Sequence, residues 1–313
     1  MPENTPLFAL SLLLVLGCGT GPCPDRSNYR GSPPPRGFKQ WCERVSANGT
    51  ATKNGPYLEW YEDAQMKIKG GFKEGQKTAT WTWWYKTGKK EKEGTYKNDK
   101  RDGRWTYWSD VGTKIREETW TNGEPNGPHV TWYPNGKLKK RGYKENGENT
   151  GAWTFWRQSG KKSAEGEYQN GKEHGKWTFF HPNGALASEG EFKVGKRDGT
   201  WLFFSQNGTK IGEGGYVLGE KAGKWQLWHE NGQIKATGAF SEGTPEETFT
   251  TWYENGQIQT TGTFKEGERQ GQWSYFWEDG VIQKQGTFSK GKKVGQWIIS
   301  SDQSGSQITA NLR

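Results

Sequence analysis

Histidine, cysteine and carboxylate side chains are the groups of this sequence that could carry out catalysis, so their spacing is considered first. The four histidines are His129, His174, His181 and His229. They form no His-Glu-x-x-His motif, and the sequence has no Cys-x-x-Cys, Gly-x-Ser-x-Gly or phosphate-binding loop. His181 and His229 occupy equivalent positions beside a turn, which is typical of a surface site. Carboxylates such as Glu165 and Glu189 recur at a fixed interval, as on a solvated strand edge, rather than as an isolated pair in a cleft. We therefore expect no enzyme, no cofactor and no metal.

The first of three cysteines follows a candidate export signal. An apolar run from Leu7 to Leu16 is too short to span a membrane as a helix, and it leads into Gly17-Cys18. This segment resembles the lipobox of bacterial lipoproteins, in which the cysteine is lipidated and becomes the mature N-terminus. The alternative is a plain secretory signal, and the first six residues lack the Lys or Arg that export signals normally carry. We expect residues 1–17 to be a lipoprotein-type signal peptide and Cys18 to be a lipid-modified membrane anchor.

Cys23 and Cys42 remain as a pair if Cys18 carries lipid. In an oxidising compartment the two can form a disulfide, and otherwise both are free thiols; the sequence leaves these alternatives open. Residues 18–37 are rich in Gly, Ser and Pro and are expected to be a flexible tether. Residues 38–54 are interpreted as an N-terminal cap and residues 300–313 as a C-terminal tail.

The composition excludes a compact domain with a thick aliphatic core. Hydrophobic residues make up 30% of the 313, there are 46 glycines, and the mean hydropathy is −1.08, values that favour disorder. The 19 Trp, 14 Phe and 12 Tyr argue against disorder, because each buried ring removes roughly 150–250 Å² from water. The net charge of +9 arises from interspersed basic and acidic residues, which indicates a solvated surface. A nucleic-acid partner is not expected, because rings that form a core cannot also stack on bases.

The sequence repeats with a period of 24 residues. Steps of 24 from Gly55 meet glycine at nine of eleven positions, the exceptions being Ala79 and Glu247. Two residues later the column is mostly tryptophan, and three residues further a second aromatic column runs from Trp60 to Phe276. This agreement predicts a tandem array of about ten repeats over residues 55–299. The tryptophans expected to form its buried core are Trp81, Trp105, Trp153, Trp177, Trp201, Trp225, Trp273 and Trp297.

Each repeat has the pattern of a β-hairpin. A short run of aromatic and β-branched residues precedes Asn183-Gly184, and Asn-Gly predicts a type I′ turn, which needs positive φ at both central residues. The second strand ends in Gly-x-aromatic, and a second turn such as Asn170-Gly171 leads to the next repeat. Glycine supplies either positive φ or room for close backbone approach. Because one hairpin cannot bury its rings alone, we predict an all-β fold, an elongated single-sheet solenoid of antiparallel hairpins.

Some repeats depart from this pattern. His129 replaces a tryptophan, Glu247 replaces a glycine, and Pro125 and Pro245 share one column. We interpret these departures as drift in a tolerant array, the alternative being a bend or an opened face that a partner uses.

The pattern Gly-x-Trp-x-x-aromatic, then Asn-Gly, then Gly-x-Tyr/Phe-x-x-Gly resembles the MORN repeat. It is similar in particular to the variant found in bacterial YwqK-type proteins, over about residues 49–299. The resemblance implies a scaffold that binds partner proteins or membranes. It also implies the label of a toxin–antitoxin component, although an export signal does not fit neutralisation of a cytoplasmic toxin.

Our leading hypothesis is a non-catalytic scaffold, anchored by lipid in the periplasm or at the cell surface, that binds a protein partner or an envelope component. The alternative is a carbohydrate or cell-wall binding module, since short aromatic hairpin repeats also build choline-binding arrays. Exposure of the second aromatic column between repeats separates the two. An antitoxin-like component is a further alternative. The sequence does not specify the partner or the oligomeric state.

Overall fold

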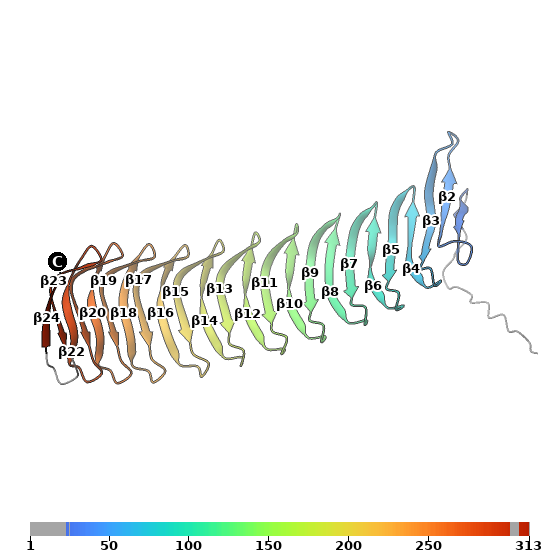
Figure 1. Cartoon of the computed structure of the whole chain (residues 1–313). Coiled ribbons are helices and arrows are strands. Elements are labelled where there is room, and N and C mark those ends of the chain that lie inside the picture. The colour runs from blue at the N-terminus through green and yellow to red at the C-terminus, as the bar shows by residue number, and fades with distance from the viewer. Residues whose placement is uncertain (1–22, 25, 301–306, 313) are drawn as a thin grey trace, which may run out of the picture. The chain divides into compact units, whose positions relative to one another are not determined.

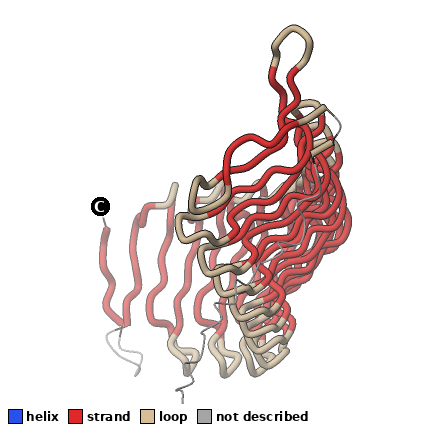
Figure 2. The backbone as a smooth tube through the Cα atoms, turned by 90° about the vertical axis from the view of Figure 1, so that its right-hand side faces the viewer, coloured by secondary structure: helices blue, strands red, loops and turns tan. Residues whose placement is uncertain are grey.

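The structure is a computed structural model that describes residues 23–24, 26–300 and 307–312. The regular secondary structure of these residues is entirely β-strand, joined by short loops (Figure 2). In the same residues no helix is long and apolar enough to cross a bilayer. The chain divides into two compact units, the first Met1–Gly103 with Asp110–Gly112 and the second Arg104–Ser109 with Thr113–Arg313. The signal peptide and Cys18 lie outside the described residues.

The first unit is built from consecutive antiparallel hairpins. Its complete strands are β1 (Asn28–Ser32), β2 (Lys39–Val45), β3 (Ala51–Trp60), β4 (Met66–Lys73), β5 (Gln76–Trp84) and β6 (Lys90–Lys97). Each of these strands pairs with the next one along the chain. Strand β7 (Lys100–Trp108) is divided between the two units.

The second unit continues the same arrangement, with each strand from β8 to β24 antiparallel to its sequence neighbour (Figure 1). Its strands are β8 (Lys114–Thr121), β9 (Glu124–Trp132), β10 (Leu138–Glu145), β11 (Glu148–Trp156), β12 (Lys162–Gln169), β13 (Lys172–Phe180), β14 (Leu186–Lys193), β15 (Lys196–Phe204), β16 (Lys210–Val217), β17 (Glu220–Trp228), β18 (Ile234–Ser241), β19 (Thr244–Trp252), β20 (Ile258–Lys265), β21 (Glu268–Phe276), β22 (Ile282–Ser289), β23 (Lys292–Ser300) and β24 (Gln307–Leu312). The predicted all-β, single-sheet solenoid of hairpins is confirmed.

In most repeats a tryptophan lying flat on a glycine joins one hairpin to the previous one. The indole of Trp177 covers Gly166 so closely that a Cβ built on the glycine would lie 2.3 Å from the ring. The strand pairing is irregular between Glu165 and Glu167, and the displaced carbonyl of Glu167 accepts a 3.0 Å hydrogen bond from the indole N–H. The same contact recurs at Gly190 beneath Trp201. Glycine therefore serves here for close approach rather than for positive φ.

The rings form an unbroken row along the second unit. Edge-to-face contacts, with centroids 5.0–6.2 Å apart, run through Trp153, Tyr168, Trp177, Phe192, Trp201, Tyr216, Trp225, Phe240, Phe249, Phe264, Trp273, Phe288 and Trp297. Such pairs add about 0.5–1.5 kcal/mol each beyond the burial of area. All eight tryptophans predicted to form the core are buried, with 0–6% of their surface exposed.

The prediction of a type I′ turn at Asn183-Gly184 is wrong. Gly184 has φ of 91°, but Asn183 is not in the positive-φ region, and the N–H of Gly184 bonds to the carbonyl of His181. The length of the loop explains the difference: the His181 N–H bonds to the Ala185 carbonyl, which leaves three residues in the loop, and such loops combine a type I turn with a left-handed glycine. Both residues of Asn170-Gly171 have positive φ, so the two-residue turn with mirror-image geometry lies between repeats.

Two of the expected domain boundaries also need correction. Residues 28–32, within the predicted flexible tether, form β1, which pairs with β2, and Gln307–Leu312, within the predicted tail, form β24, which pairs with β23. Pairing to an existing strand satisfies the backbone of a segment whatever its composition, so a Gly- and Ser-rich sequence did not reveal these strands.

We predict that Gly190→Ala destabilises the protein by about 1–3 kcal/mol, because the new methyl group lies 2.4 Å from the indole of Trp201. Gly212→Ala is the matched control, since the equivalent positions of other repeats carry Ala164 and Ala236. This control should change the free energy of unfolding by no more than about 0.5 kcal/mol. Urea denaturation measures both, and equal effects would contradict the close-approach role of Gly190.

We predict that Glu247→Gly stabilises the protein. Glu247 occupies the first glycine column with φ of 65°, a left-handed conformation that costs a non-glycine residue roughly 1–2 kcal/mol. After the greater chain entropy of glycine is subtracted, a gain of about 0.5–1 kcal/mol remains. Thr248→Gly, one residue away in the strand, should lower stability instead. A thermal melt in which both variants behave alike would rule out strain at Glu247.

Candidate binding surface

The two aromatic columns differ in their exposure. The tryptophans of the first column are buried, whereas the side chains of the second column are half-buried in both units. In the second unit this second column consists of Trp108, Trp132, Trp156, Phe180, Phe204, Trp228, Trp252 and Phe276. These residues recur once per repeat, and each is partly open to solvent. They therefore form a periodic apolar feature of the surface, and the sequence had identified their column.

Side chains that follow the second column hold successive hairpins together. The Tyr133 hydroxyl donates a 2.8 Å hydrogen bond to the backbone carbonyl of Trp156, 23 residues later. Arg157 donates to Phe180 in the same way, and Nε2 of His181 and His229 lies 2.8 and 2.9 Å from the carbonyls of Phe204 and Trp252. The two histidines are thus half-buried and structural, so their prediction as plain surface residues is wrong. These four residues occupy equivalent positions in their repeats. Because the position is filled by Tyr, Arg or His, the sequence did not indicate that they share one role.

His129 and Glu118 replace the tryptophan–glycine pair in one repeat. His129 occupies the tryptophan column and Glu118 occupies the glycine column beneath it, and the two side chains are buried, with 6% and 5% of their surface exposed. Nδ1 of His129 lies 3.6 Å from a carboxylate oxygen of Glu118, and Arg116 approaches that carboxylate at 3.7 Å. The His129 substitution was visible in the sequence, but its compensating partner, Glu118, was missed because the glycine column had not been linked to the tryptophans.

Burial alone would raise the pKa of Glu118. The imidazole of His129, the charge of Arg116 and the hydroxyl of Tyr107 outweigh burial and hold the pKa below its ordinary value of 4.5.

His174, the remaining histidine, is exposed on β13. Within the described residues no cluster of three or more His, Cys, Asp or Glu side chains could hold a metal ion.

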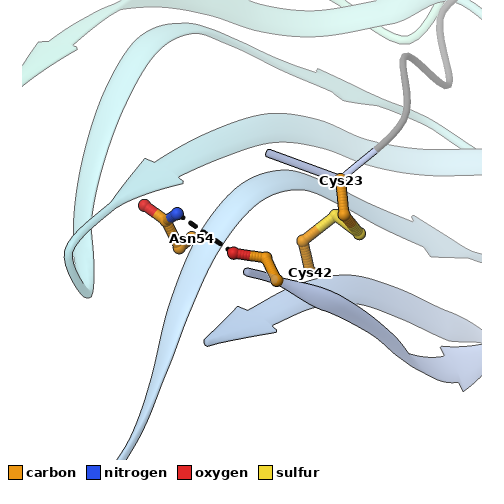
Figure 3. Close-up of a disulfide and its surroundings, with 4 residues drawn as sticks. Cys23, Cys42 and Asn54 are labelled. Carbon is orange, nitrogen blue, oxygen red and sulfur yellow. Dashed lines mark hydrogen bonds between the residues drawn. A yellow bond between two sulfur atoms is a disulfide. The ribbon is translucent and has the colours of Figure 1, made fainter. Parts of the chain in front are cut away.

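A disulfide closes the start of the first unit. Cys23 and Cys42 form a disulfide, with their Cα atoms 5.6 Å apart (Figure 3). The sequence had left open whether these two cysteines are bonded or free. Nearby, the Asn54 amide donates a 3.1 Å hydrogen bond to the hydroxyl of Ser27. Cys42 is fully buried, so the bridge ties the segment before β1 to the hairpin core.

Grooves open in the second unit beside a third column, which lies four residues after the first glycine column. Many repeats carry an aromatic residue there, such as Phe155 or Phe179, and the exceptions include Thr131, Leu227 and Thr251. Each lines a groove, and the volumes are about 600, 710 and 490 Å³. We call them the Thr131, Leu227 and Thr251 grooves. All three are also lined by rings of the second column, so they connect the half-buried rings with concave surface.

Six segments match the family described as MORN repeat variant, at residues 77–98, 125–146, 173–193, 221–241, 248–266 and 269–290. These six segments are similar to MORN repeats. Five of them start two repeats apart, and the 24-residue repeats between them follow the same glycine and aromatic columns. No curated protein matches the chain.

Three solved structures resemble this chain only distantly. They are crystal structures of TcdB2-TccC3-Cdc42, TcdB2-TccC3, and TcdB2-TccC3 without its hypervariable C-terminal region. Sequence identities are 10, 11 and 11%, TM-scores are 0.19, 0.19 and 0.20, and the matches cover 87, 90 and 92% of this chain. The chain spans only 16, 17 and 17% of those chains. At these TM-scores the likeness carries no argument.

We predict that Glu118 makes stability depend on pH in the acid range. Because its folded-state pKa is lowered, its contribution is complete above the unfolded value near 4.5 and is lost as the pH falls through the lower folded value. The double variant Glu118→Gly/His129→Trp restores the usual pair of this array and removes the buried Glu118 carboxylate together with the imidazole beside it. It should be more stable by about 1–4 kcal/mol and lack this acid step. Urea midpoints between pH 3 and pH 7, roughly the range over which carboxylates titrate, measure both effects. Parallel pH profiles for the two proteins would contradict the assignment.

Proposed function

We propose that this chain is a non-catalytic scaffold that binds a protein partner or an envelope component along its second aromatic column. The half-burial of that column carries the proposal. Rings that only stabilised the sheet would be covered like those of the first column, whereas these expose part of their faces at a regular interval. Aromatic side chains are enriched at binding interfaces because they bring large contact area at little cost in side-chain entropy.

Export of the protein is part of the proposal. The bond between Cys23 and Cys42 supports it, because disulfides persist mainly in oxidising compartments outside the cytosol. Together with the lipobox-like segment ending at Cys18, it favours a chain tethered to a membrane, with its MORN repeats facing the envelope.

A carbohydrate or cell-wall ligand is the second candidate, and the grooves favour it. Sugars bind in concave sites where aromatic rings contact their C–H faces and a few polar groups fix their orientation. The Thr131 groove combines Trp132 and Trp156 with the hydroxyl-bearing Thr131 and Ser163.

The test is capture from envelope extract with the purified protein, followed by direct titration of the component recovered. The wild type should retain a defined protein or polysaccharide, and Trp156→Ala/Trp228→Ala should retain less than about a tenth as much, since aromatic anchors dominate binding energy. Val217→Ser is the control, because this valine is 58% exposed but lies outside the second column. Circular dichroism establishes that the variants fold. Equal retention by all three proteins, or chemical turnover of the bound component, would contradict the proposal.

A further inference from the structure

The Thr131 groove carries an unusual concentration of positive charge. In the pairing of β8 with β9 and of β9 with β10, Arg116 and Lys140 both lie opposite Thr131, one on each side. Lys139 is a third cation at the groove, and no carboxylate is among the residues that line it. The short side chain of Thr131 thus leaves space between two cations, where an aromatic ring fills the equivalent space in neighbouring repeats.

The two flanking cations are positioned by rings. The guanidinium of Arg116 lies 3.9 Å from the ring centre of Tyr107, and the ammonium of Lys140 lies 5.6 Å from that of Trp153. Arg116 also pairs with the buried Glu118. The hydroxyl oxygen of Thr131 is buried without a hydrogen-bond partner in the described part of the chain.

The charge on Lys140 is poorly compensated. Burial lowers its pKa, and the like charges of Lys144, Lys139 and Arg116 lower it further. An anion placed between Arg116 and Lys140 would relieve this repulsion, because an opposite charge within a few ångströms favours the charged form of an amine.

The other two grooves show that the cations belong to this site and not to the repeat. Four repeats further along the chain, the positions of Arg116 and Lys140 are taken by Gly212 and Ala236. The Leu227 groove is lined by Glu230 and Glu254 together with Lys221 and Lys235. The Thr251 groove is lined by Glu254 and Glu278 together with Lys235. The framework of rings is shared, but only at the Thr131 groove are the cations without a carboxylate in the lining.

We propose that the Thr131 groove binds an anionic sugar residue of a polysaccharide, with its carboxylate between Arg116 and Lys140 and its ring against the aromatic side chains. The inference rests on the proposed function, since it specifies an envelope component for the same surface. A sugar acid offers an apolar C–H face together with a carboxylate, which are the two chemistries that the groove presents. The groove volume of about 600 Å³ falls within the range of small-molecule sites.

A uniformly charged polyanion fits this surface less well. A nucleic acid or another strand with a charge on every residue would pass from the Thr131 groove to the Leu227 and Thr251 grooves, where carboxylates stand beside the lysines and the attraction is not repeated. A polysaccharide that carries acid groups only at intervals can place one of them at the cationic groove alone. Discrimination by such charge placement is the usual effect of electrostatic complementarity.

The test is calorimetric titration of the full chain with trigalacturonate. The matched neutral probe is its methyl ester, which has the same sugar faces without the charge. The wild type should bind trigalacturonate, with affinity falling as salt rises, and should bind the methyl ester at least about tenfold more weakly. Lys140→Gln should weaken trigalacturonate binding by a similar factor. Thr131→Phe should abolish binding by filling the groove with the ring that other repeats carry, while the fold is retained.

Thr251→Phe and Lys235→Gln are the controls, because the first alters the position equivalent to Thr131 and the second removes a cation that lines the other two grooves, and both should bind as the wild type does. Equal binding of the ester and the acid, or undiminished binding by Thr131→Phe, would overturn the inference. So would absence of binding to trigalacturonate, or binding only to acidic phospholipid vesicles or to a single-stranded oligonucleotide. If trigalacturonate fails while capture still depends on Trp156 and Trp228, the inference is wrong and the proposed function stands. If capture is also independent of these rings, both fail.

Discussion

The contact between a tryptophan ring and a glycine of the preceding hairpin is the constraint on which the rest of the structure depends. It requires a residue without a side chain at one column and an indole at another, and it uses the carbonyl displaced by a local irregularity to satisfy the indole N–H. Each hairpin supplies the glycine for the next ring. No repeat is therefore complete alone, and stability accumulates through nearest-neighbour interfaces, as in other repeat proteins.

This arrangement also limits where function can lie. Rings of the first column are committed to the core, and the side chains after the second column are committed to bonds between hairpins. What remains for recognition is the exposed part of the second column and the grooves where a repeat lacks the ring that Phe155 or Phe179 supplies elsewhere. At Thr131 the missing ring coincides with two cations that line the groove, and next to it the Glu118–His129 pair replaces the usual contact. The most divergent repeat of the second unit is thus also the one with the most distinctive chemistry.

The architecture could be predicted from the sequence because the period is short and free of insertions. Glycine and tryptophan columns recur at one spacing, so strands, hairpins and buried rings followed from a few local rules. The first turn was mispredicted because Asn183-Gly184 was interpreted as a two-residue loop, whereas three residues lie between the paired His181 and Ala185. β1 and β24 were missed because their pairing depends on a neighbouring strand rather than on their own composition.

The role of His181 could not be deduced from the sequence, since Tyr133 and Arg157 make the same hydrogen bond with different side chains. The grooves were not predicted because each arises where a small or aliphatic side chain replaces an aromatic ring. The sequence alone does not show which side chains surround that position.

Hydrogen exchange of the indole N–H protons, followed by NMR in the native protein, tests the central contact most directly. Trp153, Trp177, Trp201, Trp225 and Trp273 each donate to a carbonyl of the preceding hairpin at 3.0–3.2 Å. Their indole protons should exchange as slowly as the strand amides beside them and become labile only with cooperative unfolding. Half-buried Trp156 and Trp228 should exchange much faster. Fast exchange at the first group, similar to that of the second, would show that the rings do not hold the hairpins together.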